Sequence, residues 1–330
     1  MTILVPLMSK RLSIVVISYN NDRELPRTLL SLGASYQRGI MREDYEVIVV
    51  DNGSISPPQQ KQFSHMDVDV RIESMPSPSK SPAPAINLGI AIATGDTIGV
   101  MIDGARLASP GLLTNALAAM RVSDRAFVGS RGRYLGPDFQ ALSMKKGYSQ
   151  RVEDMLLDQI EWINDGYRLF SVSVFDESSG PTWFDLPSES NGLFMSRPLW
   201  KELGGYDPAF VSPGGGLVNL DTWFRACHLP NSIPIILLGE ATFHQIHGGI
   251  CTNSADRAQT FIHFNEEYRS IRGTSYQWPN IPVTYYGAFQ TPPPAREIST
   301  SRFSYEGQKQ VLLKAWHKTT TQVKSFFKKS

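Results

Sequence analysis

Runs of apolar residues alternate with helix-like segments over the first hundred residues of the chain. The runs Leu12–Ser18, Tyr45–Asp51 and Thr97–Ile102 are continuous and mostly aliphatic, which is typical of strands that are buried on both faces. A shorter run, Val68–Glu73, predicts one more strand. Apolar residues recur at helical spacing in residues 21–36, after the first run, and in residues 83–95, before the last. This alternation predicts an α/β fold whose mostly parallel central sheet carries helices on both faces.

The second half of the chain predicts further elements and then a C-terminal extension. Helical patterns occur at 110–122, 148–165, 217–229 and 255–273, and strand patterns at 126–136, 169–175 and 234–244. Residues 180–216 are rich in Gly, Pro, Ser and Trp, and residues 285–300 have the composition of a Pro-rich linker. We therefore expect a first domain over residues 1–250 and a C-terminal helical extension over residues 251–330.

Residues 308–330 predict a basic amphipathic helix at the end of that extension. Leu312, Trp316, Val323 and Phe327 lie at helical spacing, and six lysines accompany them without an acidic residue. Such a helix either lies on an anionic membrane surface or packs on a protein with its charges in solvent. The sequence leaves both interpretations open.

The composition narrows the class of protein. A formal net charge of +1 over 330 residues does not favour a nucleic-acid-binding protein, which usually carries a basic excess. Two cysteines favour a reducing compartment over a disulfide framework. No apolar run approaches the roughly 20 residues of a membrane span, and the first residues lack the features of a signal peptide. We therefore expect a cytoplasmic protein, and the oligomeric state stays open.

Polar residues follow three of the predicted strands, at Ser18–Asn20, Asp51–Ser54 and Asp103–Arg106. Ligands of open parallel sheets bind beyond the carboxyl ends of the strands, where these residues would gather. A carboxylate there can accept hydrogen bonds from a base or a ribose, and Tyr19 can cover the face of a base. The sequence holds neither a GxGxxG nor a P-loop motif. Singly each acid would also fit a turn or a helix cap, but together the three strand ends predict a nucleotide site.

Six segments, taken in order, resemble the family-2 glycosyltransferases, which share the GT-A fold. They are LSIVVISYN, YEVIVVDNGS, AINLGIAIATGDTIGVMIDGARLASPG, SNGLFMSRPLWKELGGYDPAF, NLDTWFRA and TFHQIHGG. The resemblance implies an enzyme that moves a sugar, with inversion, from a nucleotide-diphosphate sugar to a hydroxyl of a glycan or lipid-linked acceptor. A lipid-linked acceptor would also suit a place at the inner face of the membrane.

The resemblance implies roles for individual residues as well. Residues assigned to donor binding are Ser18, Tyr19, Asn20, Asp51, Asn87, Asp103, Arg106, Asn191 and Gly192. Asp221 matches the carboxylate that takes the proton of the acceptor hydroxyl. It stands at the start of a predicted helix, where an acid also interacts favourably with the helix dipole.

Ala105 departs from the family pattern at an important point, because it replaces the second acid of the DxD motif, which holds a metal ion. The leaving diphosphate is strongly anionic, so its charge needs another source of stabilisation. Asp103 and His247 can hold Mg²⁺ or Mn²⁺ together with phosphate oxygens. Alternatively, the guanidinium of Arg106 pairs directly with a phosphate. His244 lies closer to its strand and is interpreted as a structural histidine.

Two other functions stay open at this point. A degenerate GT-A protein that only binds a nucleotide or glycan is compatible with Ala105. A sugar nucleotidyltransferase would need a Gly-rich loop with Arg or Lys directly after the first strand, and the segment SYNNDREL lacks one.

Overall fold

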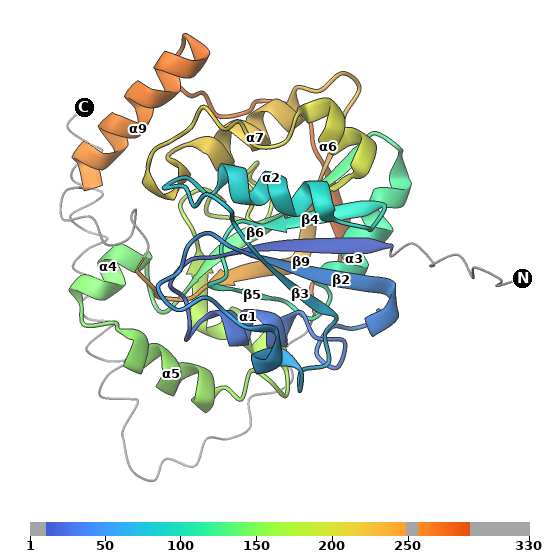
Figure 1. Ribbon diagram of the computed structural model, residues 1–330, viewed down its shortest axis with the longest axis vertical. Helices are drawn as coiled ribbons and strands as arrows, with labels where there is room; N and C mark the ends of the chain where they lie inside the picture. Colours follow the sequence, from blue (N-terminus) through green and yellow to red (C-terminus); the bar gives the residue numbers. More distant parts are fainter. Residues whose placement is uncertain (1–10, 249–256, 291–330) are drawn as a thin grey trace, which may run out of the picture. The chain divides into compact units, whose positions relative to one another are not determined.

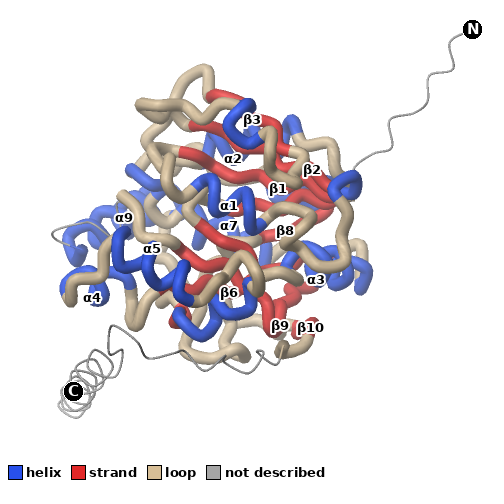
Figure 2. The backbone as a smooth tube through the Cα atoms, turned by 90° about the horizontal axis from the view of Figure 1, so that it is seen from below, coloured by secondary structure: helices blue, strands red, loops and turns tan. Residues whose placement is uncertain are grey.

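A ten-stranded sheet runs through residues 11–248 and 257–290, which are the residues that this computed structural model describes (Figure 1). The strands lie in the order β10-β9-β6-β8-β4-β1-β2-β3, while β5 pairs with β9 and β7 with β6. Their bounds are β1 Leu12–Ser18, β2 Tyr45–Asp51, β3 Val70–Ser74, β4 Thr97–Met101, β5 Arg106–Ala108, β6 Ala126–Leu135, β7 Ser173–Phe175, β8 Leu193–Ser196, β9 Ile233–His244 and β10 Thr284–Gly287. Figure 2 shows the strands from below, from β3 at one edge to β10 at the other.

Most neighbouring strands are parallel, which confirms the predicted sheet type. β1 pairs in parallel with β2 and β4, β2 pairs in parallel with β3, and β9 pairs in parallel with β6 and β10. β8 is the exception inside the sheet, because it runs antiparallel between β4 and β6. The short strands β5 and β7 add antiparallel pairs to β9 and β6.

Helices cover both faces of the sheet, as predicted (Figure 1). The α-helices are α1 Leu25–Ser31, α2 Ala83–Ile92, α3 Leu112–Ala119, α4 Gln140–Lys145, α5 Gln150–Gln159, α6 Arg197–Leu203, α7 Val218–Cys227 and α9 Arg257–Arg272. Short 3-10 helices lie at Arg42–Asp44, Gln60–Phe63, Met120–Val122, Gly166–Val172 and Pro213–Gly215. The hydrophobic core has one layer with α2, α6 and α7 and another with α1 and α3.

The continuous apolar run of β1 follows from this double cover. Ile14 and Val16 pack into the layer that contains α1 and α3, whereas Val15 and Ile17 pack into the layer of α2, α6 and α7. Successive side chains of a strand point to opposite faces, so both sets are buried only when both faces are covered.

Three short elements differ from the sequence predictions. Residues Arg106–Ala108 form β5, where no strand is predicted, and Leu193–Ser196 form β8 within the Gly/Pro-rich segment. Thr284–Gly287 form β10 at the start of the predicted linker. Each of these strands has three or four residues and pairs with a strand distant in sequence, so no local pattern marks it. The predicted strand at 169–175 is mostly 3-10 helix, with β7 at its end.

The division of the chain also differs from the boundary predicted at residue 250. The described residues up to Gln290 form one compact unit, because β10 extends the sheet beside β9 and α9 packs on its helical layer. The tail over residues 308–330 lies outside the described residues, so its membrane contact stays a prediction. Within the described ranges, none of the helices combines the length and apolarity that a bilayer span requires.

A buried carboxylate fixes the middle of β9 to the start of α3. Glu240 is fully buried and accepts hydrogen bonds from Gly111 N–H at 3.1 Å, Asn115 Nδ2 at 3.2 Å and Tyr167 OH at 2.7 Å. The hydroxyl of Ser109 also donates to it. Because burial dominates, the pKa of Glu240 lies above its usual value despite these donors.

We expect Glu240→Ala to lower the free energy of unfolding by about 3 kcal/mol or more, because each orphaned buried donor costs about 1–3 kcal/mol. Urea unfolding followed by circular dichroism measures the loss. Glu240→Gln keeps one acceptor oxygen and should lose less. Glu202→Ala is the matched control, since Glu202 pairs with Arg125 on the exposed surface. A loss under about 1 kcal/mol for Glu240→Ala would show that these hydrogen bonds matter little.

Candidate active site

The polar ends of β1, β2 and β4 meet at one edge of the sheet. Ser18 pairs with Asp51 across β1 and β2, and Val16 pairs with Met101 across β1 and β4. Asp103 follows β4 by two residues, so it reaches the same edge as Ser18 and Asp51. The structure therefore brings together the three strand ends that the sequence singles out.

The loop after β1 is held against the loop after β2. Asn20 adopts a left-handed conformation with φ of +50°, its backbone N–H donates to Ser54 Oγ at 2.8 Å, and its Oδ1 accepts from Ile55 N–H at 2.8 Å. Ser18 donates from Oγ to Asn21 Oδ1 at 2.8 Å. These contacts leave Tyr19 59% exposed.

Asp51 is buried and shapes the turn that follows β2. Its Oδ2 accepts from the N–H groups of Gly53 and Ser54 at 3.2 and 3.1 Å, and its Oδ1 accepts from Ser54 Oγ at 2.5 Å. Gly53 has φ of +91°, which a residue with a side chain rarely adopts. Asp51 thus acts as a turn-former in the structure, and its predicted contact with the base stays a proposal.

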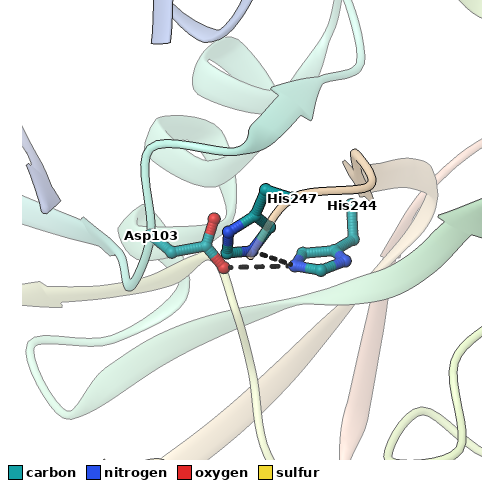
Figure 3. Close-up of side chains that lie close together, drawn as sticks. All are labelled: Asp103, His244 and His247. Carbon is teal, nitrogen blue, oxygen red and sulfur yellow. Dashed lines mark hydrogen bonds and ion pairs between the residues drawn. The ribbon is translucent and has the colours of Figure 1, made fainter. Parts of the chain in front are cut away.

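Asp103 lies beside two histidines from the end of β9 (Figure 3). His244 Nε2 is 3.5 Å from Asp103 Oδ2 and 3.0 Å from His247 Nε2. The three residues offer one ligand atom each within 4.8 Å of one another. A carboxylate with two imidazoles is a donor set that binds divalent transition metals, so these residues fit such an ion.

Gln140 of α4 fixes the orientation of the His244 ring. His244 Nδ1 lies 2.7 Å from Gln140 Oε1, which only accepts hydrogen bonds, so Nδ1 carries the proton and Nε2 presents its lone pair to Asp103 and His247. Burial and the charge of Arg106 lower the pKa of His244 to about 4. The ring is therefore neutral near pH 7, which is the form that binds metals.

Arg106 is the cation next to this group. It is buried on β5, directly opposite His244 of β9, and its Nε lies 3.3 Å from Asp103 Oδ2. Burial would raise the pKa of Asp103, but Arg106 and His244 outweigh it and hold that pKa well below its usual range. Among the described residues, Arg106 Nη1 is buried without a hydrogen-bond partner.

Ala105, which stands in place of the second acid of the DxD motif, links two loops of the site through its backbone. Its side chain is buried, its N–H donates to Asp103 Oδ1 at 2.7 Å, and its carbonyl accepts from Gln245 N–H at 2.8 Å. Position 105 therefore anchors the loop that carries Asp103 to the loop that carries His247.

Asp221 occupies a different environment from the one that its predicted role requires. It is fully buried in the first turn of α7. Its carboxylate accepts from Arg225 Nε at 2.7 Å and from Arg272 Nε and Nη2 at 2.6 and 2.8 Å. A general base needs an accessible lone pair, and this carboxylate would have to break an ion pair to take a proton. The geometry argues against Asp221 as the base.

The remaining predicted donor residues divide into two groups. Asn191 and Gly192 precede β8 at the edge where β4 ends, and a Cβ at Gly192 would meet Ser130 Oγ at 2.4 Å. Asn87 instead braces the loop after α6, because its amide donates to Tyr206 O at 2.7 Å and accepts from Tyr206 N–H at 2.9 Å. Both polar atoms of the Asn87 amide are thus engaged in structural hydrogen bonds.

The sequence model of the family described as Glycosyl transferase family 2 matches residues 13–179, about half of the chain. The chain belongs to glycosyl transferase family 2. The matched range contains β1, β2 and β4 with the polar residues that follow them, so the family assignment and the geometry of the strand ends agree. No relative was found among curated protein sequences.

Solved structures resemble this family-2 domain in fold. TarS 1-349 of S. aureus superposes with a TM-score of 0.50 and 14% identity, covering 79% of this chain and 72% of that chain. The same protein in complex with UDP-GlcNAc gives a TM-score of 0.49 and 14% identity over 78% and 66% of the two chains. At 14% identity, the similarity to TarS 1-349 shows the fold alone, which is the predicted GT-A fold.

Sequence reasoning did not assign His244 or Gln140 to the site of this family-2 domain. The segment TFHQIHGG contains both histidines, but only the pairing of β9 with β5 shows that the first of them, His244, faces Asp103. Gln140 lies 104 positions from His244 and carries no recognisable motif.

Proposed function

We propose that this protein is a glycosyltransferase that moves a sugar from a nucleotide-diphosphate sugar to an acceptor hydroxyl, with inversion at the anomeric carbon. One observation carries the proposal. A family-2 domain brings a carboxylate, a buried arginine and two histidines to the carboxyl edge of its sheet, at Asp103, Arg106, His244 and His247. These groups suit the binding and release of a diphosphate.

The nucleoside would occupy the ends of β1 and β2. The exposed ring of Tyr19 can stack on a base, and Asn20 and Asp51 hold the two loops that flank it. Ser18 lies beneath these loops at the end of β1. We assign Asn191 and Gly192 to the sugar side of the donor, because they precede β8 next to Asp103.

Charge on the leaving diphosphate would be stabilised from two directions. Asp103, His244 and His247 would hold a divalent cation, which supplies Lewis-acid stabilisation of phosphate oxygens. The unpartnered Nη1 of Arg106 points to a direct hydrogen bond with a phosphate oxygen. Gln140 keeps the His244 ring in the tautomer that leaves Nε2 free to bind the cation.

The proposal is tested with purified full-length protein and a panel of donors: UDP-glucose, UDP-galactose, UDP-N-acetylglucosamine and GDP-mannose. We expect slow release of nucleoside diphosphate from at least one donor into water when Mn²⁺ is present, and calorimetric binding of the matching nucleoside diphosphate. An acceptor screen of octyl glycosides with that donor then gives the product, and NMR gives its anomeric configuration.

The outcomes separate the functions that the sequence leaves open. Nucleotide binding without release from any donor would indicate a non-catalytic binding protein. No binding of UDP or GDP would refute the proposed donor class altogether.

A further inference from the structure

Glu189 reaches the carboxyl edge of the sheet from a segment that the sequence predicts as loop. β8 runs antiparallel to β4, with Leu193 opposite Val100. Continuing this register backwards along the chain carries residues 189–191 past the end of β4, where Asp103 follows. Glu189 is half-buried there.

A chain of hydrogen bonds from uncharged side chains holds the Glu189 carboxylate. Asn219, in the first turn of α7, donates from Nδ2 to Glu189 Oε2 at 2.6 Å and to Asn191 Oδ1 at 3.3 Å. The Asn219 Oδ1 accepts from Tyr206 OH at 3.4 Å, which turns the Nδ2 group toward Glu189. The carboxylate is therefore oriented by amide and hydroxyl groups of the buried residues beneath it.

The charge environment of Glu189 is the opposite of that of Asp221. Two arginines pair with Asp221, whereas within the described residues no Lys, Arg or His forms an ion pair with Glu189. Burial and then the charge of Asp176 raise the pKa of Glu189, against the smaller effects of Ser178, Arg106 and Asn219. A carboxylate with a raised pKa is a stronger proton acceptor than an ion-paired one.

We propose that Glu189 is the general base of the glycosyl transfer, an inference that rests on the proposed function. The acceptor O–H gives its proton to a Glu189 carboxylate oxygen while the acceptor oxygen bonds to the anomeric carbon. The bond from that carbon to the diphosphate oxygen breaks, and its electron pair leaves with the nucleoside diphosphate. Asn219 and Tyr206 are positioning residues, and Asp221 is a structural ion-pair centre that joins α7 to α9.

The test compares Glu189→Ala and Glu189→Gln in the full-length protein with a donor that the wild-type protein hydrolyses. Water as acceptor also needs a base, so we expect release of the nucleoside diphosphate to fall at least 100-fold. Sodium azide is an anionic nucleophile that needs no deprotonation. It should restore release by Glu189→Ala and yield a glycosyl azide, which mass spectrometry detects.

Two variants control for indirect effects. Glu202→Gln makes the same substitution at an exposed glutamate and should leave release unchanged. Asp221→Asn should lower the melting temperature through its lost ion pairs, while release per folded molecule stays within tenfold of wild type. Melting curves of all variants show that the protein is folded in the assay.

Three results would overturn the assignment of Glu189. The first is that Glu189→Ala releases nucleoside diphosphate within tenfold of the wild-type rate. The second is that its release falls strongly but azide does not restore it. The third is that Asp221→Asn loses release and azide restores it. If the wild-type protein hydrolyses no donor in the panel, the proposed function fails instead. The two failures are therefore distinguishable.

Discussion

Removal of divalent cations with EDTA is expected to lower donor turnover by at least about a thousandfold, and added Mn²⁺ is expected to restore it. The reason is the donor set, because Asp103 offers one carboxylate while His244 and His247 offer two imidazoles within 4.8 Å. Mg²⁺ prefers oxygen ligands and should restore less activity than Mn²⁺. Release of nucleoside diphosphate at fixed donor concentration measures the effect.

The variant Gln140→Leu tests whether the metal requirement arises from Asp103, His244 and His247. Among the proposed ligands, the hydrogen bonds of the described residues join the Gln140 side chain only to His244, whose Nδ1–H it accepts at 2.7 Å. Losing this acceptor frees the ring, so the apparent Mn²⁺ affinity should fall by about 10- to 100-fold. High Mn²⁺ should then recover most of the rate. Full turnover in excess EDTA would instead show that Arg106 alone balances the charge of the diphosphate.

Arg106→Ala is expected to reduce turnover by about 10²- to 10³-fold, as the loss of a donor to a developing anion does elsewhere. The guanidinium is buried beside Asp103, and its Nη1 has no partner in the described structure. A phosphate oxygen of the donor would accept the hydrogen bond that this Nη1 group can donate. Calorimetry with UDP and GDP should show weaker binding, and steady-state release of nucleoside diphosphate gives the rate.

Arg106→Lys and Arg125→Ala are the controls for this experiment. Lysine keeps the charge but loses the planar fork, so we expect an intermediate rate. Arg125 pairs with Glu202 on the exposed surface, and its loss should not change turnover. A rate for Arg106→Ala within threefold of wild type, with an unchanged melting temperature, would contradict the phosphate contact.

Some of the site was predictable because it lies where local pattern and topology coincide. Asp51 and Asp103 follow apolar runs that only a buried strand explains, and parallel strands bring their carboxyl ends together. The role of Asp221 was not predictable in this way. An acid at a helix start carries no sign of Arg272, 51 positions later on α9, which pairs with it.

The sequence by itself determined the alternation of strands and helices, because strands that are buried on both faces appear as continuous apolar runs between segments of helical spacing. This alternation implies parallel strands, so it also determined the edge of the sheet at which Asp51 and Asp103 lie. Tertiary structure alone decided that His244 faces Asp103, that Arg106 is buried on a strand, and that an amide holds Glu189 while arginines neutralise Asp221. Protonation and reactivity depend on charges and donors a few ångströms away, and the chain brings these together from distant segments.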